Sequence, residues 1–136
     1  MGVFFMNANQ LTLVKSFLRA FAGIEEDSAM RKAIGLIRRN KRYLWQFPNE
    51  GKCVFLEGRE ASEAFDYADK TEAFEFVFDG PFSYDGPIPL AKEHLTSALI
   101  KEDGVREFYV FGKKFEWCYV VTHEGDACGP FFFNVC

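Results

Sequence analysis

The sequence predicts an α+β fold in which helices pack against a largely antiparallel sheet of about five or six strands. Two segments with helical periodicity come first, and apolar segments of strand length follow. Several of these later segments are joined by short turns, which favour antiparallel neighbours. Aromatic residues make up 18% of the chain, with 17 Phe among them, and such rings are typical of strands and of large-ring cores.

The N-terminal part, residues 1–42, predicts a helical hairpin. Its first helix has Asn9 as a candidate cap, an apolar face at helical spacing, and Gly23 as a stop. Its second helix begins near Asp27 and carries a basic run over residues 38–42. Cations at that end complement the helix dipole.

The remaining part, residues 43–136, contains the predicted sheet. Strands are expected at 43–47, 53–56, 72–79, 107–111, 115–122 and 131–135, helices at 59–68 and 89–101, and a Gly- and Pro-rich loop at 80–87. Trp117 lies on the strongest of these strands and is expected in the core. No repeat or low-complexity linker divides the sequence, so residues 1–136 are expected to form a single domain.

The charge is unevenly distributed. Residues 1–49 carry a net charge of +5, residues 50–85 of −7 and residues 86–136 of −2, which gives −4 for the whole chain. An acidic total makes nucleic acid an unlikely main ligand and suits a protein partner with a basic surface. Candidate interaction residues are Glu60, Glu63 and Asp66 of the acidic middle, together with Phe82 and Tyr84, whose rings are either exposed contacts or core residues.

The four cysteines, Cys53, Cys118, Cys128 and Cys136, form no Cys-x-x-Cys pair. No secretory signal and no membrane-length apolar segment is visible, so we expect a cytoplasmic protein with reduced thiols. The even number of cysteines leaves two disulfides in a secreted protein as the alternative. Zinc sites need about four ligands at short paired spacings. This spacing is missing, so neither a metal nor another cofactor is predicted.

Four residues near the end of the Trp117 strand could form a site: Thr122, His123, Glu124 and Cys128. Neighbouring strand residues point to opposite faces, so His123 and Glu124 converge only if the strand has already ended. In one interpretation the polar side chains bind local backbone groups. In another, His123 acts with Glu124 or Cys128 on a small ligand, and this second interpretation requires a pocket at the strand end.

The C-terminal half resembles an uncharacterised bacterial family built on a domain of unknown function. The matching positions are Trp117, the run Thr122-His123-Glu124, and Gly129-Pro130 followed by an aromatic residue. The resemblance covers about residues 43–133 and implies a small cytoplasmic α+β protein without an established activity.

Composition and motifs together favour a non-enzymatic protein-interaction module, of an immunity-like or regulatory kind. The alternative is a small-ligand binder or an enzyme with its site around His123. The oligomeric state is left open by the sequence.

Overall fold

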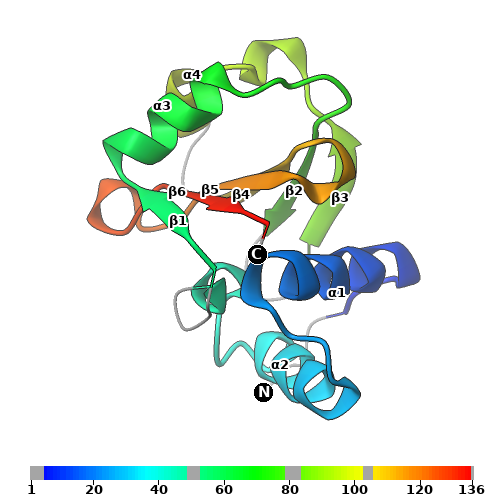
Figure 1. Cartoon of the computed structure of the whole chain (residues 1–136). Helices are drawn as coiled ribbons and strands as arrows, with labels where there is room; N and C mark the ends of the chain where they lie inside the picture. The colour runs from blue at the N-terminus through cyan, green and yellow to red at the C-terminus, as the bar shows by residue number, and fades with distance from the viewer. Residues whose placement is uncertain (1–4, 49–52, 79–83, 103–105, 136) are drawn as a thin grey trace.

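The computed structural model describes residues 5–48, 53–78, 84–102 and 106–135, and it has the predicted α+β architecture (Figure 1). Its sheet has six strands in the order β1-β6-β5-β4-β2-β3, and every neighbouring pair is antiparallel. The strands are β1 (Phe55–Glu57), β2 (Phe74–Phe78), β3 (Tyr84–Pro89), β4 (Glu107–Phe111), β5 (Trp117–Val121) and β6 (Phe131–Asn134).

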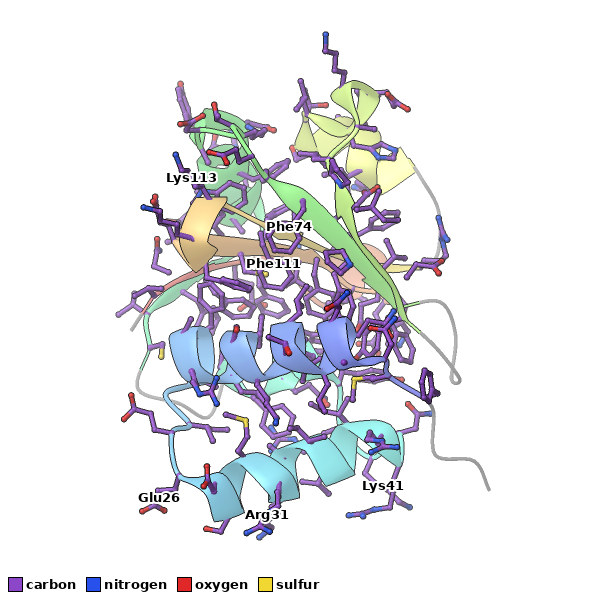
Figure 2. The ribbon with its side chains drawn as sticks, turned by 90° about the vertical axis from the view of Figure 1, so that its right-hand side faces the viewer. Glu26, Arg31, Lys41, Phe74, Phe111 and Lys113 are labelled. Carbon is purple, nitrogen blue, oxygen red and sulfur yellow. The ribbon has the colours of Figure 1, made fainter. Side chains whose placement is uncertain are left out.

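Helices cover both faces of the sheet. The helices are α1 (Ala8–Ala22), α2 (Asp27–Arg38), α3 (Arg59–Tyr67) and α4 (Ser97–Glu102), and short 3-10 turns are η1 (Leu44–Gln46), η3 (Lys92–His94), η4 (Lys113–Phe115) and η5 (Gly125–Ala127). The α1–α2 hairpin lies on one side, with α1 between the sheet and α2, and α3 and α4 lie on the other side (Figures 1 and 2). The predicted N-terminal helical hairpin is therefore confirmed.

Helix α1 begins two residues earlier than predicted because Asn7, not Asn9, caps it. The Asn7 side chain accepts a hydrogen bond from the Gln10 backbone, and the Gln10 side chain accepts one from the Asn7 backbone. The Gln10 amide also donates to the carbonyl oxygen of Tyr84 at 2.8 Å, which ties α1 to β3. Gly23 ends the helix with φ at 68°, as predicted.

Alternation along the strands separates two cores. Towards α1, the ring of Phe17 packs edge-on against Tyr109, Phe111 and Phe133 at centroid distances of 5.9, 6.1 and 6.0 Å. Towards α3, Phe65 stacks on Tyr119 at 4.3 Å. Trp117 lies in this second core, as predicted. The aromatic content of the chain is therefore used on both faces of one sheet.

The prediction of a strand at residues 43–47 is wrong. Residues 44–46 form η1, and the side-chain oxygen of Gln46 accepts a hydrogen bond from the Tyr43 backbone at 2.8 Å, which closes the turn. The backbone N–H of Trp45 donates to the hydroxyl of Tyr109 at 3.1 Å. A distant side chain thus satisfies the backbone group that a sheet neighbour would have satisfied.

Two further boundaries differ from the prediction. The predicted loop at 80–87 contains the start of β3, an edge strand that tolerates proline because only one of its sides is paired. The predicted helix at 89–101 is divided: β3 runs to Pro89, and η3 precedes the short α4. Residues 80–83 lie outside the described residues.

The cysteines differ from one another. Cys118 is buried and free, and Cys128 is half-buried and free. Cys53 is disulfide-bonded. The expectation of reduced thiols is therefore wrong at Cys53. Among the helices of the described segments, none has the length and apolar character that a membrane span requires.

Candidate functional site

A buried carboxylate, Glu107 at the start of β4, organises the best-built polar cluster among the described residues. Its Oε1 accepts hydrogen bonds from Trp45 Nε1 at 2.9 Å and from His123 Nδ1 at 3.1 Å. Its Oε2 accepts a hydrogen bond from the hydroxyl of Tyr109 at 2.7 Å. The cluster joins η1, β4 and the end of β5, which are far apart in the sequence.

Burial sets the acidity of this cluster. The side chain of Glu107 has no exposed surface, and burial raises its pKa, while hydrogen bonds from Tyr109, His123 and Trp45 oppose the rise. Burial and the nearby Glu107 hold the pKa of Tyr109 well above its usual value. Tyr109 is therefore a neutral donor at physiological pH, as its bond to Glu107 requires.

The end of β5 directs His123 toward Glu107. The strand stops at Val121, and the Thr122 hydroxyl donates to the carbonyl oxygen of Cys128 at 2.6 Å and accepts from the Glu124 backbone at 3.3 Å. The chain has thus turned before His123, and strand alternation no longer applies to it. Thr122 performs the backbone-binding role proposed from the sequence.

The imidazole of His123 is held by one ring nitrogen and is partly open to solvent. Because a carboxylate oxygen accepts from Nδ1, Nδ1 carries a hydrogen and Nε2 is left to accept from a ligand when the ring is neutral. The side chain is 35% exposed, and the ring of Tyr43 lies over it at 4.8 Å. The arrangement can receive a proton or a hydrogen bond at Nε2.

Cys128 is unsuited to act as a nucleophile beside His123. Burial raises the pKa of its thiol, and the charge of Glu124 and a hydrogen bond to Glu124 raise it further. The reactive thiolate is therefore scarce at neutral pH. Within the described segments, no group of three His, Cys, Asp or Glu side chains could hold a metal ion.

The His123 hypothesis requires a pocket at the end of β5 beside His123. A small pocket lies near this strand end, but His123 is not among its lining residues. The pocket has a volume of about 100 Å³. It lies between α3, α4 and the sheet, and its polar lining includes Ser62, Ser97, Lys101 and Tyr119. The pocket and the exposed imidazole are thus two separate features.

The acidic residues of α3 divide into two groups. Glu60 and Glu63 are exposed and lie on one stripe of the helix with Tyr67, whose residue surface is 91% exposed. We call these three residues the α3 stripe. Asp66 instead accepts hydrogen bonds from the backbone and hydroxyl of Ser97, both at 2.8 Å, and so anchors the start of α4.

Two aromatic residues of the predicted loop, Phe82 and Tyr84, were candidates for interaction with a partner. Tyr84 is buried and stacks on Phe76 at 4.4 Å, so it is a core residue of the sheet. Phe82 lies outside the described residues.

A family model described as Domain of unknown function (DUF4275) matches residues 7–132. The chain belongs to this family. The predicted membership in an uncharacterised family is confirmed, and the match extends over the N-terminal helices, which the resemblance over 43–133 had left out.

One curated relative is viral. Protein MC132 of Molluscum contagiosum virus subtype 1 is 34% identical over 80 residues, which are 57% of this chain and 29% of the viral protein. The chain thus matches less than a third of the length of that relative. No solved structure gives a significant match.

In this DUF4275 chain, sequence reasoning found His123 but missed its partners Glu107, Trp45 and Tyr43. A signal for Glu107 was present: it shares a strand face with Tyr109 and Phe111 in an otherwise apolar segment. A carboxylate there must be buried and therefore paired. The sequence contains no comparable signal that Trp45 would be its donor.

Proposed function

We propose that this DUF4275 protein is a protein-interaction module, immunity-like or regulatory in kind, that docks a partner through the α3 stripe. The observation that carries the proposal is the exposure of Tyr67, 91%, at the end of α3, on the same stripe as the exposed carboxylates of Glu60 and Glu63. Tyrosine is enriched at interfaces because it buries a large ring and keeps a polar end. The partner would offer an apolar depression with a basic rim.

The test is capture of partners from source-cell lysate at low salt. The wild type is compared with Glu60→Lys/Glu63→Lys and with Tyr67→Ser. The matched control, Glu93→Lys/Glu116→Lys, makes the same charge change at two exposed acids outside α3. The proposal expects a stoichiometric partner that both stripe variants lose and the control retains. Equal capture by all variants would exclude the α3 stripe.

A second function is favoured by a separate observation, the 3.1 Å hydrogen bond between Glu107 Oε1 and His123 Nδ1. A buried carboxylate that fixes Nδ1 leaves Nε2 as the ring nitrogen that can serve a ligand or proton transfer. Under this alternative the protein binds a small molecule beside Tyr43.

A thermal-shift screen of small molecules against wild type and His123→Gln tests the alternative. His94 provides the matched control, since its Nδ1 also approaches a carboxylate, that of Glu75, at 3.5 Å. A ligand whose stabilisation disappears in His123→Gln and persists in His94→Gln supports the alternative. A ligand that stabilises both variants equally binds elsewhere.

A further inference from the structure

The two helical layers carry opposite charge. Helix α3 lies on one side of the sheet and α1 and α2 on the other (Figures 1 and 2). The α3 stripe carries carboxylates, whereas α1 and α2 carry Lys15, Arg19 and Arg31. The +5 and −7 imbalance between residues 1–49 and 50–85 is therefore also a separation in space.

A groove runs between α1 and α2 at the basic side. It has a volume of about 380 Å³ and is lined by Lys15 and Arg19 of α1 and by Asp27, Met30 and Arg31 of α2. Met30 is buried at 4% exposure, so an apolar side chain lies under the basic rim. We call this feature the α1–α2 groove.

The cations of the groove outnumber the acids that line it. Over the segments that the structure describes, Lys15, Arg19 and Arg31 make no ion pair and no side-chain hydrogen bond. Asp27 is the one acid in the lining. Three cations against one carboxylate leave the groove net positive, which favours an anionic occupant.

We propose that the occupant is the α3 stripe of a second copy of this chain. This inference rests on the proposed docking role of the stripe and names its partner. The groove and the stripe are complementary in charge. In the proposed contact, cations at the rim of the groove face the carboxylates of Glu60 and Glu63. The ring of Tyr67 enters between guanidinium groups, above Met30. Arginine both pairs with carboxylates and stacks on aromatic rings.

The contact joins two different surfaces, so it is head-to-tail. The stripe and the groove lie on opposite sides of the sheet (Figure 1), and one copy therefore keeps a free stripe when its groove is filled. Repetition of a heterologous contact gives an open chain of copies unless the rotation closes a ring. Association should therefore grow with protein concentration beyond the dimer.

Light scattering and sedimentation of the wild type provide the first test. At about 0.01 M salt, where the Debye length is roughly 30 Å, the weight-average mass should rise with concentration above the 15.6 kDa of one chain. At about 0.15 M salt, where screening shortens that length to roughly 8 Å, the mass should fall back. A wild type that remains at the mass of one chain at low salt overturns the proposal.

Two variants make the test specific. The stripe-reversed variant is Glu60→Lys/Glu63→Lys, and the groove-reversed variant is Arg19→Glu/Arg31→Glu. Each should have the mass of one chain by itself, because one of the two surfaces is lost. Mixed in equal amounts they should associate again, because the intact stripe of one variant fits the intact groove of the other, and the two reversed surfaces are also opposite in charge.

A mixture that stays at the mass of one chain, or variants that associate as the wild type does, overturns the proposal. Circular dichroism checks that each variant is folded, and Arg19→Gln/Arg31→Gln replaces the groove-reversed variant if reversal unfolds it. The control Glu93→Lys/Glu116→Lys should associate like the wild type. If copies do not associate while the stripe variants still lose a captured partner, self-association is wrong and the proposed function stands.

Discussion

His123 Nδ1 lies 3.1 Å from Glu107 Oε1, so an exposed imidazole at the end of β5 is fixed by a carboxylate with no exposed surface at the start of β4. The same oxygen also accepts from the indole of Trp45. The pair therefore ties η1 to the sheet and holds one nitrogen of a partly exposed imidazole.

The pH dependence of stability should reflect Glu107. Its pKa is raised by burial above the ordinary value of 4.5, so the folded state holds the proton more tightly than the unfolded state. The stability that Glu107 contributes is then fully present below pH 4.5 and is lost as pH rises through the folded-state pKa. We expect the free energy of unfolding of wild type, relative to Glu107→Gln, to decrease over this window. Urea unfolding of both proteins from pH 4 to pH 8 measures it, and a constant or increasing difference would contradict the assignment.

Trp117 and Gly112 should be energetically coupled. Trp117 stacks on Phe132 at 5.5 Å and packs against Phe65 at 5.8 Å, so Trp117→Ala should cost about 3–5 kcal/mol. A Cβ on Gly112 would overlap the indole of Trp117, and Gly112→Ala should cost about 1–3 kcal/mol by overpacking.

Denaturant unfolding of wild type, Gly112→Ala, Trp117→Leu and the double variant forms a double-mutant cycle that checks the coupling. With Leu at position 117 the added methyl group of Gly112→Ala has room, so its cost should shrink. If the cost were the same with Trp and with Leu, the clash would be absent.

Asp66 should stabilise α4 rather than a partner. Its carboxylate accepts from the backbone and hydroxyl of Ser97, so Asp66→Ala should accelerate amide exchange in α4 and lower the melting temperature slightly. Glu63→Ala serves as the control, because the exposed Glu63 makes only a surface ion pair with Arg59 at 3.5 Å. Hydrogen exchange read by mass spectrometry should show faster exchange in α4 for Asp66→Ala alone.

The thiol of Cys128 should alkylate slowly and respond to Glu124. Burial, followed by the charge and hydrogen bond of Glu124, raises the Cys128 pKa. Glu124→Gln removes the charge, lowers that pKa and should increase the rate of reaction with iodoacetamide at pH 7. Cys118 provides an internal reference, because complete burial raises its pKa well above the usual value. An unchanged or slower reaction of Cys128 in Glu124→Gln would rule out this electrostatic effect.

Local patterns were enough for the elements that depend on local rules. Helical periodicity and Gly23 defined α1, and alternating or continuous apolar runs defined β2, β4 and β5. The run from Tyr43 to Phe47 has the composition of a strand, yet it forms η1. Its polar partners, Tyr109 and Glu107, lie more than sixty residues away, and no local pattern contains them.

Only the part of the candidate site that depends on local sequence could be predicted. His123 was found because it follows a strand, and Thr122 was expected to bind the backbone, as it does. Glu107 was not selected, because its role depends on the register of β4 beside β5 and on the position of Trp45. Asp66 was grouped with Glu60 and Glu63 by charge alone, and only the packing of α3 against α4 separates their roles.

The two outer strands of the sheet affect how the protein behaves when crowded. β1 has three residues, and β3 contains Pro87 and Pro89, which have no N–H to offer a further strand. Neither edge is a good template for another chain, so growth into cross-β fibrils is disfavoured in spite of an unusually Phe-rich sequence. The protein can therefore concentrate many rings in a small domain while its aggregation hazard is confined to the unfolded chain.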